Sequence, residues 1–214
     1  MKIDRQGRII LAIESAVSGG SISLLCNGDE VANWLGSSNI SKAEDLLANI
    51  DILLTESKIS IDEVDLIAVS AGPGSFTGIR IGIATALGLK NGLGTKMASE
   101  SALRAMAFTQ PPSTQDIVTA LPVGRNAICQ QRFKRSQKEA VALNDPDTLT
   151  EDEFISLVQP QKNTAFLLHE DLYKKITPPV ASINFGKNIA YAIGLICGEN
   201  DHVITEPLFI SKKF

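Results

Sequence analysis

The chain has 214 residues, of which 44% are hydrophobic and 21% are charged, and its formal net charge is −4. The length suffices for one large domain or two small ones, and the negative charge argues against a broad electrostatic surface for nucleic acid or anionic membranes. Three cysteines without a C-x-x-C pair, together with two histidines, argue against a disulfide framework and against a metal site. We therefore expect a cytoplasmic protein with free thiols.

Three short strands are predicted at the start of the chain, over residues 8–14, 21–26 and 30–35. The Asn27-Gly28 turn is a strong hairpin signal, and Glu14 stops the first apolar run short of a membrane span. An antiparallel meander followed by helix, strand and helix resembles one half of the actin, hexokinase and Hsp70 type of fold. In nucleotide-binding members of that fold an Asp ends the first strand, where this chain has Glu14.

A helix is predicted over residues 41–57, because apolar residues recur there at helical spacing. Ser41 and Glu44 fit a capping box, in which each side chain accepts from the backbone N–H of the other residue. Ile52 is an additional apolar position on the opposite side of the helix. The apolar face consists of Leu46, Leu47, Ile50, Leu53 and Leu54.

The next stretch is Ser70-Ala71-Gly72-Pro73-Gly74-Ser75-Phe76-Thr77-Gly78-Ile79-Arg80. It follows an apolar run at residues 64–69 that is typical of a buried strand, so it joins a strand to a helix over residues 76–92. Gly72, Pro73 and Gly74 permit a sharp turn before Ser75, which is the expected N-cap.

From Phe76 to Leu89 no face of this second helix is charged except at Arg80, so the helix must be covered on more than one side. Gly78, Gly82 and Ala86 are spaced by four and would form a groove without side chains, which a second helix can approach closely. We expect this groove to be exposed. The face expected to lie on the sheet is Phe76, Ile79, Ile83 and Leu87.

The remainder of the chain predicts a second set of α/β elements. The segment Gln110-Pro111-Pro112-Ser113-Thr114 is the expected linker, which divides the chain into an N-terminal half of residues 1–110 and a smaller C-terminal half of residues 111–214. The predicted elements are a helix over 99–107 capped by Ser99, strands at 117–122, 127–133, 139–143 and 165–168, a helix capped by Thr150 with Glu153 at the box position, a helix over 183–196, and an extended tail at 206–210.

The glycines from Gly72 to Gly78 can be read as a phosphate loop, because glycines before a helix expose backbone N–H groups. The consensus loop needs G-x-x-x-x-G-K-[ST], and this turn has no Lys. The dinucleotide fingerprint G-x-G-x-x-G also fails, since Gly78 comes one residue late. We therefore interpret Gly72, Pro73, Gly74 and Ser75 as a structural turn.

The sequence disfavours a nucleophilic catalytic site and an RNA-binding site. The G-x-S-x-G elbow is not matched around Ser75, and a catalytic base would have to come from His169 or His202, far downstream. A basic cluster at residues 132–138 could touch RNA phosphates, but it lacks interleaved aromatic residues, and a solvated strand face is the commoner explanation. The cluster consists of Arg132, Lys134, Arg135 and Lys138.

The stretch from Gly72 to Gly82, followed by Ala84-Thr85-Ala86 and Gly88-Leu89, closely resembles the signature of the bacterial TsaB (YeaZ) family. The agreement is strong over residues 9–98 and fainter after them, where it includes residues 123–131 and Glu206-Pro207-Leu208. The resemblance implies an actin-like, ribonuclease H-like α/β fold of two related halves.

The resemblance also implies a function. The chain would be a non-catalytic scaffold that pairs with the catalytic paralogue TsaD, joined by the ATPase TsaE, in forming N6-threonylcarbamoyladenosine in ANN-decoding tRNAs. Alone it would form a homodimer, and it would reach tRNA only through the complex. No catalytic residue, metal or cofactor is expected. Pairing would use the helices at 41–57 and 76–92, through Leu46, Ile50, Gly78, Ile81, Gly82, Thr85, Ala86 and Leu89.

The chain departs from the family pattern at Glu14, where Asp is usual, at Lys42 instead of His, at Ala71 instead of Arg, and at Gly124 instead of Asp. These changes remove polar groups that could support a nucleotide or contact a partner. They weaken the case for ligand binding more than the case for pairing, which chiefly needs shape. The alternative is an enzyme, either a nucleotide-binding one of the sugar kinase and Hsp70 superfamily or a glycoprotease-like peptidase.

Overall fold

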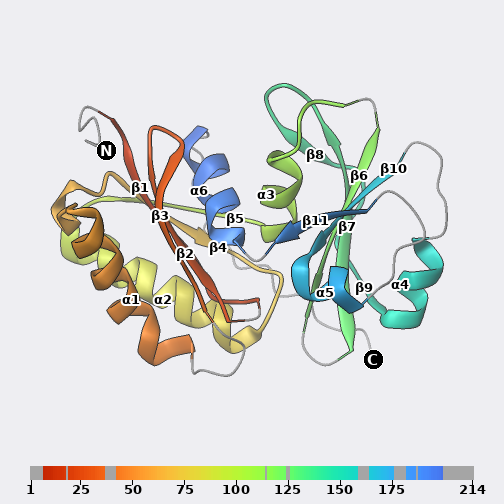
Figure 1. Ribbon diagram of the computed structural model, residues 1–214, viewed down its shortest axis with the longest axis horizontal. Coiled ribbons are helices and arrows are strands. Elements are labelled where there is room, and N and C mark those ends of the chain that lie inside the picture. Colours follow the sequence, from red (N-terminus) through yellow and green to blue (C-terminus); the bar gives the residue numbers. More distant parts are fainter. Residues whose placement is uncertain are drawn as a thin grey trace.

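Two mixed β-sheets lie on either side of a pair of helices in the computed structural model (Figure 1). The structure describes residues 7–17, 19–36, 42–113, 115–123, 126–158, 164–175, 182–186 and 188–199. The strongest hydrophobic runs of the sequence form the central strands, and these are buried along their whole length, as in β1 and β4.

The first sheet has the strand order β3-β2-β1-β4-β5. Its first three strands form the predicted antiparallel meander, and β4 and β5 then add in parallel. Helices α1 and α2 cover one face of it and contact each other. The bounds are β1 (Ile9–Glu14), β2 (Ser21–Cys26), β3 (Asp29–Leu35), α1 (Lys42–Ser57), the short 3-10 helix η1 (Ile61–Glu63), β4 (Leu66–Ser70), α2 (Phe76–Leu93) and β5 (Lys96–Glu100).

The second sheet repeats this plan with the strand order β11-β10-β6-β7-β8, while β9 pairs with the other part of β7. Strands β6, β7 and β8 are antiparallel neighbours, and β10 and β11 are parallel additions. The predicted fold of two related α/β halves is therefore confirmed. The bounds are β6 (Asp116–Pro122), β7 (Ala127–Arg135), β8 (Ala140–Ala142), β9 (Asp147–Thr150), α4 (Glu151–Leu157), β10 (Thr164–His169), α5 (Glu170–Lys175) and β11 (Ser182–Gly186).

The last helix of each half packs against the sheet of the other half. Helix α3 (Ala102–Phe108) follows β5 but contacts β6, β7 and β8, whereas α6 (Ile189–Glu199) follows β11 but contacts β1, β2, β4 and β5. Gly194 lets α6 approach closely, since a Cβ there would lie 2.5 Å from Leu25 Cδ1 and 3.1 Å from Ala12 Cβ. One continuous hydrophobic core consequently contains residues of both halves.

Two predicted helices begin later than the sequence suggested. Residues 99–100 belong to β5, and Ser101, not Ser99, caps α3 by accepting from the Arg104 N–H. The helix predicted over 183–196 also divides, because residues 182–186 form the strand β11 and α6 begins only at Ile189. In both places these residues pair with a neighbouring parallel strand, β4 for β5 and β10 for β11. This tertiary pairing overrides the local helical pattern.

Several expectations concern residues outside this description. The Ser41–Glu44 capping box, Lys42 as a side chain, Gly124, His202 and the tail at 206–210 lie outside the described residues or side chains. Among the helices that are described, none is long and apolar enough to cross a membrane.

Candidate functional site: the outer surface of α1 and α2

The turn between β4 and α2 is built as its residues predict. Gly72 has a φ of 96°, which favours glycine, and the Gly72–Pro73 peptide is cis. Ser75 is the N-cap of α2, and its hydroxyl accepts from the Gly78 N–H at 3.3 Å. The backbone carbonyl of Ser75 accepts from the Ile79 N–H at 2.9 Å. Two of the four N–H groups in the first turn of α2, those of Gly78 and Ile79, are thus bonded to Ser75.

The loop after β1 closes around the carboxylate of Glu14. Glu14 is buried, and its Oε1 accepts from the backbone N–H groups of Ala16 and of Val17, the latter at 2.9 Å. The loop's N–H donors therefore already face a carboxylate of the same chain. This arrangement leaves the loop ill suited to bind a second anion.

We expect the replacement of Glu14 by alanine to lower the free energy of unfolding by about 2–4 kcal/mol. The reason is that two buried N–H groups would lose their acceptor, and each buried donor left unpaired costs about 1–3 kcal/mol. Glu14→Gln keeps one side-chain oxygen as an acceptor and should cost less. Urea unfolding of both variants measures the difference, and equal losses would contradict the role given to this carboxylate.

The small-residue face of α2 is not exposed, so the predicted orientation of this helix is wrong. Gly78, Gly82 and Ala86 are buried against the chain's own β1 loop and sheet. A Cβ on Gly78 would lie 2.1 Å from the Ser15 carbonyl oxygen, and one on Gly82 would lie 2.4 Å from Ser15 Oγ. Ser15 Oγ also donates to the Gly78 carbonyl at 2.8 Å. The glycines are needed because α2 packs closely on this loop.

Other residues expected to bind a partner also belong to the core of the first half. Leu46 and Ile50 are buried beneath α1, where they pack with β1 and β4. Ile81 and Leu89 are half-buried against the same core, and Thr85 is half-buried beside them. A buried side chain cannot contact a partner unless the helix that covers it moves away. The predicted helices thus remain candidates for pairing, but not through the buried Leu46 and Ile50.

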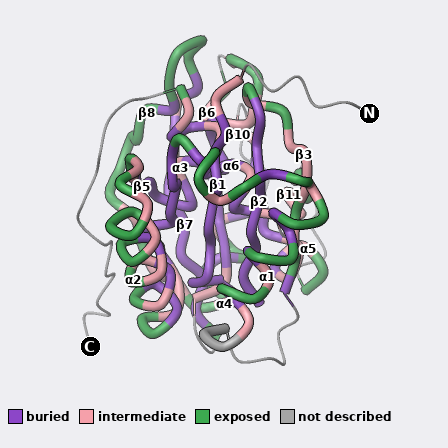
Figure 2. The backbone as a smooth tube through the Cα atoms, turned by 90° about the vertical axis from the view of Figure 1, so that its left-hand side faces the viewer, coloured by how far each residue is buried: buried purple, intermediate pink, exposed green. Residues whose placement is uncertain are grey.

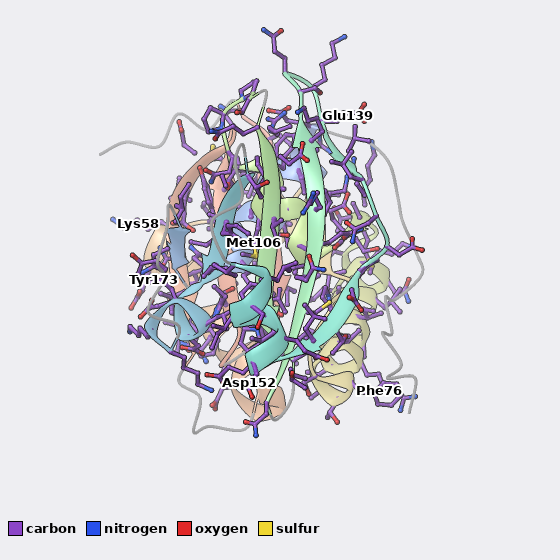
Figure 3. All side chains as sticks on the ribbon, turned by 90° about the vertical axis from the view of Figure 1, so that its right-hand side faces the viewer. Lys58, Phe76, Met106, Glu139, Asp152 and Tyr173 are labelled. Atoms are coloured by element: carbon purple, nitrogen blue, oxygen red, sulfur yellow. The ribbon has the colours of Figure 1, made fainter. Side chains whose placement is uncertain are left out.

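Large apolar side chains instead face outward from both helices. Leu47 and Ile52 of α1 are 56% and 51% exposed, and Phe76 and Leu87 of α2 are 51% and 42% exposed. Figure 2 shows the outer turns of α1 and α2 as exposed, and Figure 3 shows Phe76 at the periphery of the molecule, whereas Met106 lies in its interior. We call this the α1–α2 surface, defined by Leu47, Ala48, Ile52, Phe76, Arg80, Ala84, Leu87 and Gly88.

Sequence reasoning placed Phe76 and Leu87 on the sheet, and the structure corrects this. Both are exposed, because the helix turns the side with Gly78 and Gly82 inward. Arg80 was a usable signal, since a charged residue in an apolar helix marks the solvent side, and its guanidinium lies 3.7 Å above the Phe76 ring. Ile52, off the main apolar face of α1, was a second signal.

The remaining candidate groups form no second site. Burial raises the pKa of the Cys129 thiol to about 12 and that of Cys197 to about 12, so both stay protonated and unreactive at neutral pH. His169 is buried, and its Nδ1 accepts from the Asp171 N–H at 3.3 Å. Within the described part of the chain, no group of three or more His, Cys, Asp or Glu residues is placed to hold a metal ion.

The basic cluster is largely committed to contacts inside the chain. Arg135 is buried, stacks on the Phe108 ring at 4.4 Å and donates to the Phe108 carbonyl at 2.9 Å. Arg132 and Lys134 both pair with Asp116, at 3.8 Å and 3.3 Å. These contacts favour the structural interpretation of the cluster over an RNA-binding one.

Comparison with known proteins agrees with this architecture. The family model described as TsaD, tRNA N6-adenosine threonylcarbamoyltransferase, matches residues 39–194. The chain is 31% identical over 126 residues to the tRNA threonylcarbamoyladenosine biosynthesis protein TsaB of Haemophilus influenzae, which covers 58% of this chain and 52% of that protein. It is 36% identical over 98 residues to TsaB of Escherichia coli, covering 46% and 42%. The chain thus spans about half the length of these curated relatives, or less.

The fold has a counterpart among solved structures. YeaZ from Pseudomonas aeruginosa superposes with a TM-score of 0.68 and 21% identity, over 89% of this chain and 91% of that one. At this level of identity the likeness is one of fold. The family model nevertheless covers most of the sequence, including both helices of the α1–α2 surface. The chain therefore belongs to the family described as TsaD, tRNA N6-adenosine threonylcarbamoyltransferase, and is related within it to the proteins called TsaB and YeaZ.

Proposed function

We propose that this chain is a non-catalytic subunit that pairs with a TsaD-like paralogue, joined by a TsaE-like ATPase, in forming N6-threonylcarbamoyladenosine in ANN-decoding tRNAs in the cytoplasm. The observation that carries the proposal is the α1–α2 surface, with Leu47, Ile52, Phe76 and Leu87 all more than two fifths exposed. Exposed apolar side chains gathered on neighbouring elements mark surfaces that bind other proteins. The names of the curated relatives supply the pathway.

A scaffold role also agrees with the interior of the site. In the β1 loop the N–H groups of Ala16 and Val17 donate to Glu14, and near the start of α2 the Gly78 N–H donates to Ser75. The hydroxyls of the loop and the turn both bond to the Gly78 backbone: Ser15 Oγ donates to its carbonyl and Ser75 Oγ accepts from its N–H. These facts favour pairing over the nucleotide-binding and peptidase alternatives, and tRNA would be reached only through the complex.

We expect Leu87→Asp to weaken binding to the purified TsaD-like paralogue of the same organism by about thirtyfold or more. A carboxylate at the centre of an apolar contact loses its hydration without gaining a partner, and central contacts carry about 2 kcal/mol or more. Calorimetric titration measures the affinity. Ile183→Asp is the matched control, because Ile183 is 43% exposed but lies on β11 of the second sheet. Unchanged affinity of the Leu87 variant would refute the proposed surface.

A further inference from the structure

The turn between β2 and β3 consists of Asn27 and Gly28. Both residues have positive φ, of 54° and 85°, as in the two-residue turn that an Asn-Gly pair favours. Asn27 is exposed, and Gly28 is half-buried. Because Gly28 has no side chain, its backbone nitrogen can approach the Asn27 side chain without a steric barrier when the turn opens locally. The turn therefore places an exposed amide next to an unhindered backbone nitrogen.

The residues before β1 hold the Asn27 side chain in place. Its Oδ1 accepts from the Arg8 N–H at 3.1 Å. A Cβ on Gly7 would lie 2.0 Å from Asn27 Nδ2, so the amide is packed directly against the Gly7 backbone. A donor at Oδ1 stabilises the negative charge that develops on this oxygen when a nucleophile attacks Cγ, as the donors of an oxyanion hole do. The Arg8 N–H thus favours attack on the Asn27 amide.

We propose that Asn27 is a site of self-modification, at which the Gly28 nitrogen attacks Asn27 Cγ. The new N–Cγ bond closes a cyclic succinimide and the Cγ–Nδ2 bond breaks, while the proton lost from the Gly28 nitrogen leaves with Nδ2 as ammonia. Water then opens the ring at either of its carbonyls and leaves aspartate or isoaspartate at position 27. No electrons are exchanged, and water is the co-reactant.

The chain contains a second Asn-Gly pair that serves as an internal control. Asn91 and Gly92 lie in the last turn of α2, and Asn91 is exposed like Asn27. A helical side chain points back toward the start of its helix, away from the nitrogen of the following residue, and that nitrogen donates to the carbonyl of the preceding turn. The two pairs are alike in sequence and exposure, so the backbone alone directs the reaction to Asn27.

Isoaspartate at position 27 would disturb the contact between this turn and α6. The main chain of isoaspartate runs through the former side chain and gains a carbon atom, in a turn that closes tightly. A Cβ on Gly28 would lie 3.9 Å from Leu195 Cδ2, and Arg8 Nη1 donates to the Gly198 carbonyl at 2.8 Å, so this corner touches the end of α6. The aspartate product keeps the main chain and an oxygen for the Arg8 N–H. Isoaspartate, and not aspartate, should therefore loosen α6.

The first test compares the two Asn-Gly pairs in the intact chain. The protein is incubated at mildly alkaline pH, and both pairs are followed by peptide mass spectrometry with electron-transfer fragmentation, which distinguishes isoaspartate from aspartate. Asn27 should convert at least about tenfold faster than Asn91 in the folded chain. In urea, where neither pair keeps its backbone conformation, the two rates should become similar. Equal rates in the folded chain, or faster conversion of Asn91, would overturn the proposal.

Two substitutions of Arg8 test the hydrogen-bond donor. Arg8→Pro removes the N–H and should slow the conversion of Asn27 at least about threefold. Arg8→Ala is the matched control, because it loses the same guanidinium contact with Gly198 but keeps the N–H, and it should leave the rate unchanged. An undiminished rate in Arg8→Pro would refute the role of the donor. If circular dichroism shows that Arg8→Pro does not fold, the comparison of Asn27 with Asn91 still decides the proposal.

The link to α6 is tested by melting. Aged protein enriched in isoaspartate at position 27 should melt at a lower temperature than fresh protein, whereas Asn27→Asp should melt like the parent chain. Equal melting of the aged and fresh protein would refute this link.

Discussion

Gly78→Ala should lower the free energy of unfolding by about 2 kcal/mol, although alanine is the better helix former. The added Cβ would lie 2.1 Å from the Ser15 carbonyl oxygen and 2.9 Å from Ala16 Cα, and both are backbone atoms. Neither can rotate away, so α2 or the β1 loop must shift. Overpacking of this kind costs about 1–3 kcal/mol and sometimes more, which exceeds the gain of about 1 kcal/mol in helix propensity.

Gly88→Ala is the matched control in the same helix. A Cβ at Gly88 meets nothing within 4 Å, so the propensity gain should appear alone, as about 0.5–1 kcal/mol of added stability. Chemical denaturation measures the change in unfolding free energy of each variant, and the two changes should have opposite signs. If Gly78→Ala were as stable as Gly88→Ala, the small-residue face of α2 would not be packed on Ser15.

Separating the halves should abolish cooperative folding of the first one. A fragment of residues 1–110 contains β1 to β5 and α1 to α3 but lacks α6, whose buried residues cover β1, β2, β4 and β5. Ile10, Leu25 and Leu66 on that face would be open to water. The fragment should therefore show no sharp thermal transition, because it cannot bury the face opposite α1 and α2.

Mixing this fragment with residues 111–214 should restore a cooperative transition, since the second fragment brings α6. Circular dichroism melting of each fragment and of the mixture is the measurement. In the intact chain, Ile193→Ala gives a graded version of the same effect, with an expected loss of about 2–5 kcal/mol from a fully buried position. A fragment 1–110 that melts as sharply as the whole chain would show that α6 is dispensable.

The face that a helix turns inward is harder to predict than the helix itself. Spacing correctly aligned Gly78, Gly82 and Ala86 on one side of α2, and it correctly placed Ser75 at the start. It could not tell whether small residues admit a partner or the chain's own backbone. The contact that decides this is with Ser15, some sixty residues earlier in the sequence, and no local pattern reports it.

The start of α6 is a different kind of failure, because a local signal was present. Asn188 precedes the helix, and its Oδ1 accepts from the Tyr191 N–H at 3.2 Å, as a capping side chain does. The prediction carried the helix back to Ile183, although Asn184, Gly186 and Lys187 interrupt the apolar residues before Asn188. The role of Glu14 was also beyond the sequence, because the N–H groups that donate to it depend on how the loop closes.

The crossing of α3 and α6 has a consequence for how the protein is made. The first sheet is complete in sequence by residue 100, yet the helix that shields its inner side spans Ile189–Glu199. At a synthesis rate of about 5–20 residues per second, that side stays uncovered on a ribosome for on the order of 5–20 s. During this interval the nascent chain exposes the apolar face of its first β-sheet. We therefore expect newly made copies to depend on holdase chaperones more than the stability of the folded protein would suggest.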